Sequence, residues 1–110
     1  MPLPNGLYKI EFRTQKDQGF GVLMLQDEKL WGGDSSMYYV GTYAQDGDNF
    51  SAEVKTGRHS NTPGIESVFG LDSVNITLKG TSSGTGAEMT GVAAEAPDVS
   101  FQAILSKLSD

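Results

Sequence analysis

His59 is the only histidine of the chain, and it lies between Arg58 and Ser60. A histidine beside a serine could serve as the general base of a nucleophilic enzyme, but such a site also needs a group that orients the base. No other residue lies at catalytic or metal-ligating spacing from His59, and the chain has no cysteine. We therefore expect a surface-loop histidine, and no metal, cofactor or catalytic residue.

The carboxylates outnumber the basic groups, with 14 acidic and 8 basic residues and a formal net charge of −6. Because a glycosidase needs only two carboxylates, 14 acidic residues leave a catalytic pair of this kind as an alternative. The overall pattern nevertheless favours a protein that is not an enzyme. The basic residues are scattered, so no cationic stripe is available for a phosphate backbone. We expect no direct binding of nucleic acid, whereas attraction of a basic partner stays open.

A corner with hydrogen-bonding potential separates two apolar stretches of the chain. Gly32 and Gly33 can adopt backbone angles that other residues avoid, and Asp34 can accept hydrogen bonds from nearby amides. These residue types predict a sharp chain reversal at Gly32, Gly33 and Asp34. We interpret the corner as structural rather than as a partner contact.

Apolar and polar residues alternate along most of the chain, which is the pattern of half-buried strands. The predicted strands are residues 7–13, 20–25, 30–31, 38–44, 50–55, 74–79, 87–94 and 99–106. The inward face of 38–44 stays open, because both of its faces are apolar. Asp46-Gly47 predicts a tight hairpin. Residues 57–64 and 65–69 are predicted as loop, with one helical turn or a buried flap as the alternatives for residues 65–69.

Eight short strands joined by turns favour an up-and-down meander that removes its two open edges by closing. We predict an all-β fold with one domain over residues 1–110, a small eight-stranded, lipocalin-like antiparallel β-barrel. A two-sheet sandwich is the alternative.

The N-terminus lacks the pattern of a secretion signal, and no apolar run is long enough to span a bilayer. We therefore expect a cytoplasmic protein without membrane insertion.

Aromatic residues recur along the predicted strands, and Phe20 and Trp31 belong to this set. An eight-stranded barrel has room for its own side chains or for one small ligand. The aromatic side chains either fill the core or line a cavity for an apolar ligand such as a lipid chain. The candidate ligand-lining residues are Tyr8, Phe12, Tyr39, Tyr43, Phe50 and Phe101.

Three blocks of the chain resemble the GrlR family of bacterial regulators, which is named for a negative regulator of type III secretion genes. The blocks are Gly6-Leu7-Tyr8-Lys9-Ile10-Glu11-Phe12, Gly19-Phe20-Gly21-Val22-Leu23 and Gly32-Gly33-Asp34-Ser35-Ser36-Met37-Tyr38-Tyr39-Val40-Gly41. The third block is the most specific of the three. The resemblance covers the chain as far as Val54 and His59, and beyond them it rests on the number and length of the strands.

The resemblance implies a lipocalin-like barrel that acts as a homodimer and restrains transcription by binding a helix-turn-helix activator protein, without reading DNA itself. In that family an acidic run on the hairpin after the Gly-Gly-Asp strand is implicated in the partner contact. The matching positions here are Gln45, Asp46, Gly47 and Asp48, of which the two aspartates are acidic. The alternative is that Asp46 and Gly47 only form the turn. A carrier or sensor of a small apolar ligand is the rival function.

Overall fold

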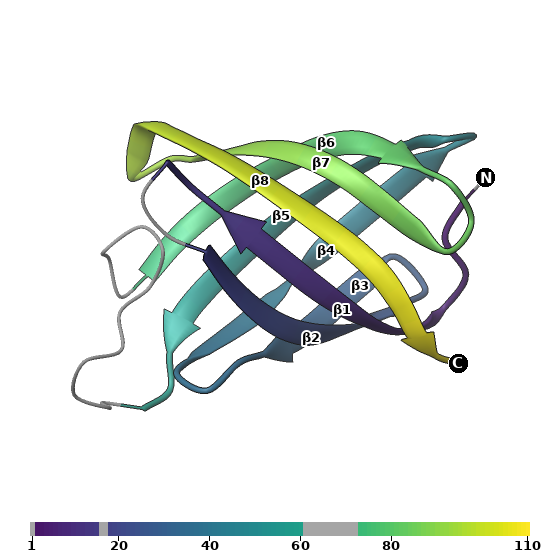
Figure 1. Ribbon diagram of the computed structural model, residues 1–110, viewed down its shortest axis with the longest axis horizontal. Coiled ribbons are helices and arrows are strands. Elements are labelled where there is room, and N and C mark those ends of the chain that lie inside the picture. Colours follow the sequence, from purple (N-terminus) through teal and green to yellow (C-terminus); the bar gives the residue numbers. More distant parts are fainter. Residues whose placement is uncertain (1, 16–17, 61–72) are drawn as a thin grey trace.

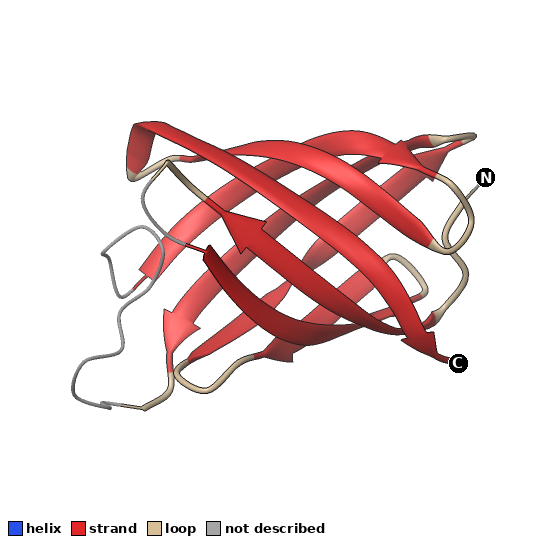
Figure 2. Ribbon diagram, in the orientation of Figure 1, coloured by secondary structure: helices blue, strands red, loops and turns tan. Residues whose placement is uncertain are grey.

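The computed structural model describes residues 2–15, 18–60 and 73–110, and all regular structure in these ranges is β-strand (Figure 2). The eight strands are β1 (Gly6–Arg13), β2 (Gln18–Gln26), β3 (Lys29–Gly33), β4 (Met37–Asp46), β5 (Asn49–Arg58), β6 (Ser73–Ser82), β7 (Gly86–Ala93) and β8 (Ala96–Ser109). Each strand predicted from alternation is present, and most extend by a few residues beyond the alternating pattern. The prediction of an all-β fold is confirmed.

The sheet closes on itself. Every strand pairs antiparallel with the next one in sequence, and β8 pairs back with β1 over a register that runs from Leu7 opposite Ser109 to Arg13 opposite Gln102 (Figure 1). This closure leaves no free sheet edge, which is the physical advantage of a barrel over an open meander. The predicted up-and-down barrel is therefore confirmed, and the sandwich alternative is excluded.

The two ends of the barrel carry different connections. The β2–β3, β4–β5 and β6–β7 turns lie with both chain termini at one end, on the right of Figure 1, which we call the N-terminal end. The β3–β4 and β7–β8 connections lie at the opposite end, together with the end of β1 and the start of β2. We call this second end the Asp34 end, after the residue that follows β3.

The pairing of β4 decides which of its two apolar faces is inside. Tyr39 and Tyr43 are buried in the barrel, whereas Tyr38 and Val40 are exposed on its outer surface. A Cβ atom at Gly21 of β2 would lie 2.8 Å from the Tyr39 hydroxyl oxygen, so the Tyr39 side chain uses interior space that this glycine leaves free. Alternation alone could not choose between these faces because both are equally apolar.

Gly32 and Gly33 do not form the predicted corner. They are the last two residues of β3, and neither has a positive φ angle. A Cβ atom at Gly32 would lie 2.1 Å from the carbonyl oxygen of Val22 on β2. Close approach of two strands therefore requires glycine here, while the reversal itself begins at Asp34.

The Asp46-Gly47 hairpin forms as predicted. Asp46 pairs with Asn49, and Gly47 takes the left-handed conformation with a φ of 61° in the two-residue loop between them. The β2–β3 turn uses the same kind of conformation without glycine, because Asp27 and Glu28 both have positive φ angles. The prediction of a loop over residues 57–64 is wrong at residues 57–58, which are the last two of β5, and residues 61–69 lie outside the described residues.

Candidate functional site

The chain's own N-terminal segment fills the N-terminal end of the barrel. Leu3 is buried, and the Gln45 side chain bonds both of its backbone groups: Oε1 accepts from the Leu3 N–H at 2.6 Å, and Nε2 donates to the Leu3 carbonyl at 3.0 Å. The Tyr8 hydroxyl donates to the Pro4 carbonyl at 2.7 Å. Polar groups that reach the interior here are thus satisfied by the backbone of residues 3–4.

Aromatic packing closes the barrel just below this segment. The rings of Tyr43 and Phe50 stack with their centroids 5.5 Å apart and their planes 12° apart. Tyr8 is fully buried beside them, and burial raises the pKa of its phenol, with the charges of Tyr43 and Asp110 adding to the effect. This packed layer forms the floor of the space that remains inside.

A cavity of about 230 Å³ extends from this floor to the Asp34 end. Its wall is mainly aliphatic and comes from strands all around the barrel. The aliphatic lining includes Leu23, Leu25, Ile76, Leu78, Met89 and Leu105. Gln18 and Ser35 also line the cavity and are exposed, so the cavity reaches the surface at this end. The site is therefore an apolar pocket with a polar rim, the usual form of a small-molecule site.

Asp34 organises the polar rim. Its Oδ1 atom accepts hydrogen bonds from the backbone N–H groups of Ser36, at 2.9 Å, and Met37, at 2.8 Å, which shapes the β3–β4 loop. The Tyr39 hydroxyl donates to Oδ2 of the same carboxylate. Burial, together with the bond to this carboxylate and its charge, raises the pKa of the Tyr39 phenol well above its ordinary value.

Asp34 is also the only charged residue among the described residues that line the cavity. Its carboxylate accepts hydrogen bonds from two backbone N–H groups and one hydroxyl, all uncharged donors, and none of the ion pairs among the described residues includes it. A partly buried carboxylate with polar but uncharged partners makes the rim electronegative.

His59 holds the β3–β4 loop from the outside. Its backbone N–H donates to the Ser36 carbonyl at 2.9 Å, and its Nε2 atom lies 2.9 Å from the Asp34 carbonyl oxygen. Because a carbonyl only accepts, Nε2 donates in this contact, and Nδ1 lies 2.7 Å from the Ser60 hydroxyl oxygen. The side chain is exposed, and neither His59 nor Ser60 is among the described cavity-lining residues. Sequence reasoning missed this loop-holding role because it depends on contact with a distant strand end.

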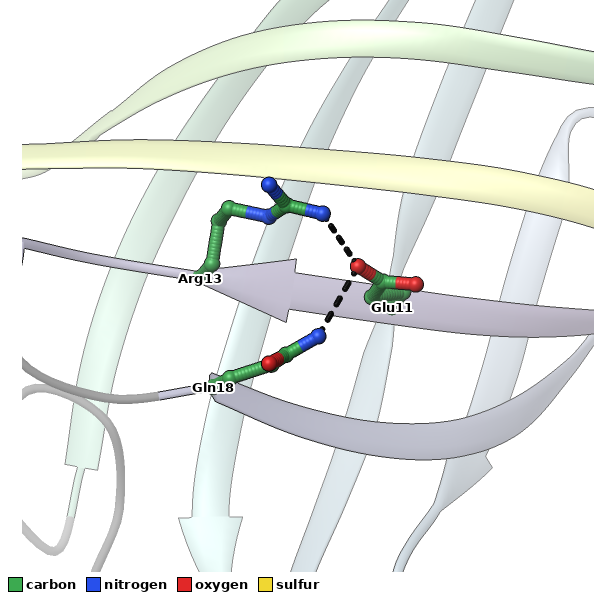
Figure 3. Close-up of polar contacts among 3 residues, drawn as sticks. All are labelled: Glu11, Arg13 and Gln18. Atoms are coloured by element: carbon green, nitrogen blue, oxygen red, sulfur yellow. Dashed lines mark hydrogen bonds and ion pairs between the residues drawn. The ribbon is translucent and has the colours of Figure 1, made fainter.

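The start of β2 is tied to β1 at the same end. Glu11 Oε2 accepts from Arg13 Nη2 and, at 3.0 Å, from Gln18 Nε2, so one carboxylate bridges two strands (Figure 3). The Arg13 guanidinium and the Gln18 amide hold the pKa of Glu11 below its usual range. This bridge fixes Gln18 at the rim of the cavity.

The six candidate ligand-lining residues divide between the two ends. Phe12, Tyr39, Phe50 and Phe101 line the cavity, and Phe12 contacts both Tyr39, edge to face, and Phe101, stacked. The other two, Tyr8 and Tyr43, are not among the described lining residues and belong to the packed floor. Of the remaining aromatic set, Phe20 lies at the rim, whereas Trp31 points outward and is exposed.

The hairpin positions matched to the GrlR family lie at the N-terminal end, away from the cavity rim. Gln45 bonds to Leu3, and the Asp48 carbonyl accepts from the Ser82 N–H at 2.8 Å. Asp46 and Gly47 are exposed. The structure therefore gives Gln45 a role in holding the N-terminal segment, and it leaves the aspartates at an accessible turn.

An exposed apolar face covers three adjacent strands on the outside of the barrel. Strand pairing aligns Val22, Gly33 and Tyr38 in one row across β2, β3 and β4. It aligns Met24, Trp31 and Val40 in a second row across the same strands. We define the β2–β4 face by its five exposed large hydrophobic residues, which are Phe20, Val22, Trp31, Tyr38 and Val40. Alternation assigned no function to this surface, although the apolar residues on the outer positions were visible in the sequence.

Fold and cavity together define a closed, eight-stranded antiparallel β-barrel with an internal apolar pocket. No protein-family model matches the chain, and no curated protein sequence matches it. The GrlR resemblance thus stays a prediction that rests on the three sequence blocks. Within residues 2–15, 18–60 and 73–110, no helix could cross a bilayer, and no three potential metal ligands come together.

Proposed function

We propose that this protein binds a small, mainly apolar molecule inside the barrel, at the Asp34 end. The observation that carries the proposal is the 230 Å³ cavity, which eight strands enclose and which the surrounding side chains do not fill. Protein interiors are normally close-packed, and unfilled apolar space costs stability. A ligand that replaces water in such a space gains the transfer free energy of its apolar surface.

The volume limits the size of the ligand. An engineered apolar cavity of about 150 Å³ binds benzene, so 230 Å³ holds roughly nine non-hydrogen atoms in proportion. Burying eight methylene groups is worth about 6 kcal/mol before the cost of immobilising the ligand. We therefore expect a dissociation constant between about 40 μM and millimolar for an eight-carbon chain.

Titration of the protein with 1-octanol, followed by calorimetry, tests the proposal. Ala52 is buried on β5 and lines the cavity, so Ala52→Leu adds three carbon atoms to the space that the ligand would use. Ala44→Leu makes the same change on the exposed face of β4 and is the matched control. We expect saturable binding that Ala52→Leu weakens at least tenfold and Ala44→Leu leaves unchanged. Absence of binding to the unaltered protein contradicts the proposal.

A second candidate function is regulation through protein contact, which the β2–β4 face favours. Monomeric proteins rarely expose large contiguous apolar patches, and such patches commonly mark protein interfaces. We propose that this face contacts a second copy of the chain, so that the protein is a homodimer. The dimer would act as a cytoplasmic negative regulator that sequesters a helix-turn-helix activator, in the manner that the GrlR resemblance implies.

Analytical ultracentrifugation tests the dimer. Trp31 lies at the centre of the β2–β4 face, so Trp31→Lys places a charge in the proposed contact. Val92→Lys introduces the same charge at an exposed valine of β7 and is the control. We expect a dimer for the unaltered protein and for Val92→Lys, and a monomer for Trp31→Lys. A monomeric unaltered protein rules out this contact.

Affinity capture from native cells tests the activator contact. The double variant Asp46→Ala/Asp48→Ala should lose a captured helix-turn-helix protein, because two carboxylates at the exposed turn attract a basic partner. Asp98→Ala, an exposed carboxylate at the other end of the barrel, is the control. Unchanged capture by the double variant removes the hairpin from the contact.

A further inference from the structure

The polar rim of the cavity bears on the chemistry of the ligand, an inference that rests on the proposed ligand-binding function. We infer that the cavity selects an amphiphile with a cationic, hydrogen-bond-donating head, such as a primary amine, and disfavours an anionic head such as a fatty-acid carboxylate. The feature that carries the inference is the single charged group of the described lining, the Asp34 carboxylate.

The position of Asp34 suits a ligand head. The aliphatic wall and the aromatic floor occupy the inner part of the cavity, so an apolar chain fits inward and its polar end lies at the rim. Ser35, Ser36 and Tyr39 line the cavity near Asp34 and add oxygen atoms to the rim. All four side chains carry oxygen, and none of them carries a positive charge.

The Asp34 carboxylate can accept one more hydrogen bond, from a donor group of a ligand. A carboxylate has about four acceptor sites, and three are used here, two on Oδ1 by backbone N–H groups and one on Oδ2 by the Tyr39 hydroxyl. One site on Oδ2 therefore stays available within the described structure. An ammonium group brings three donors and a compensating charge.

An anionic head meets the opposite conditions. A ligand carboxylate at the rim would lie beside the Asp34 carboxylate in a partly buried site, where like charges repel strongly. It would also find no basic side chain among the described lining residues to compensate its charge. A neutral alcohol has no net charge, so it lacks both the ionic attraction and the ionic repulsion, although its hydroxyl can still donate one hydrogen bond to Asp34.

Calorimetric titration with 1-octanol, octylamine and octanoate at pH 7.5 and constant ionic strength tests the inference. The three probes share one chain and differ only in the head. We expect octylamine to bind at least tenfold more tightly than octanoate, with octanol between them. Octanoate binding as tightly as octylamine, or more tightly, overturns the inference even where octanol binds. Failure of all three to bind instead overturns the proposed function itself.

Two variants assign the selectivity to Asp34. Asp34→Asn keeps an oxygen for the Ser36 and Met37 amides and removes the charge, while Asp34→Ser keeps a capping hydroxyl if the asparagine variant fails to fold. We expect either variant to reduce the ratio of octylamine to octanoate affinity to within about threefold. Asp46→Asn removes one charge at the N-terminal end and should leave the ratio intact. A ratio that stays tenfold without the Asp34 charge overturns the inference.

Discussion

At the N-terminal end of the barrel, the polar groups that reach the interior bond to the chain's own backbone, whereas at the Asp34 end a carboxylate and four hydroxyl-bearing side chains border an unfilled apolar space. Gln45 and Tyr8 hold Leu3 and Pro4 in place at the first end. Asp34 shapes a loop at the second end and still borders the cavity. This difference supports our proposal that one end of the barrel stabilises the fold while the other end binds a ligand.

Removal of a large side chain at each end provides the largest contrast. Tyr8→Ala should lower the free energy of unfolding by about 3–5 kcal/mol, because the ring is fully buried in the packed floor. Phe12→Ala should cost about 1–2 kcal/mol, because that ring is partly exposed and already borders empty space. Urea denaturation measures both, and equal costs would contradict the contrast between a packed and an unfilled end.

The N-terminal segment gives the next contrast, between two neighbours on one hairpin. Gln45→Ala removes both hydrogen bonds to the Leu3 backbone and should destabilise the protein by about 1–3 kcal/mol. Asp46→Ala, at the exposed neighbour, should change stability by no more than about 0.5 kcal/mol. Thermal unfolding compares the two variants. If they behave alike, Gln45 does not hold the segment.

The Tyr39 phenol provides a pH-dependent test at the Asp34 end. The pKa of this phenol is raised in the folded protein, so its contribution to stability is fully present below pH 10. The contribution is lost as the pH rises above 10, because the unfolded chain then releases this proton while the folded chain keeps it. The unaltered protein should therefore lose up to about 1.4 kcal/mol more per pH unit than Tyr39→Phe. Denaturation at pH 9, 10 and 11 measures the slope. Parallel curves for the two proteins would contradict the raised pKa.

The β2–β3 turn gives the smallest expected effect, and it is a gain. Glu28 has a φ of 71°, and this left-handed conformation costs a non-glycine residue about 1–2 kcal/mol. A glycine avoids this strain, but its greater freedom in the unfolded chain offsets part of the stabilisation. Glu28→Gly should stabilise the protein by about 0.5–1 kcal/mol. Glu53→Gly, within β5, should instead destabilise it by about 1 kcal/mol. A loss of stability in Glu28→Gly would show that contacts of the glutamate outweigh the backbone strain.

Alternation predicted the strands, because a period of two is a direct consequence of a sheet with one buried face. The number of strands and the cost of open sheet edges predicted the closure. The Asp-Gly dipeptide predicted the Asp46-Gly47 turn, in which Gly47 takes the left-handed conformation. The prediction of a corner at Gly32 was wrong, because the reason for that glycine is the approach of Val22 from another strand. The placement of Leu3 inside the barrel was also invisible, since residues 2–5 carry no strand pattern.

The candidate site was only half visible in the sequence. Phe12 and Phe101 were named as lining residues, and Tyr8 was named with them although it belongs to the floor. The alternating pattern showed which residues face inward, but not how far along the barrel each one lies. That position decides whether a side chain fills the packed floor or lines the cavity. Asp34 was named only as a structural residue, because its place at the rim of the cavity depends on the length of β3 and on the barrel's closure.

Methionine-methyl NMR during a titration with 1-octanol tests the central claim most directly. Met37 and Met89 line the cavity, whereas Met24 lies on the outer face of β2. Binding in the cavity predicts saturable shifts of the Met37 and Met89 methyl signals with one common midpoint, and no shift for Met24. Shifts confined to Met24, or no shift at saturating octanol, would contradict a ligand site inside the barrel.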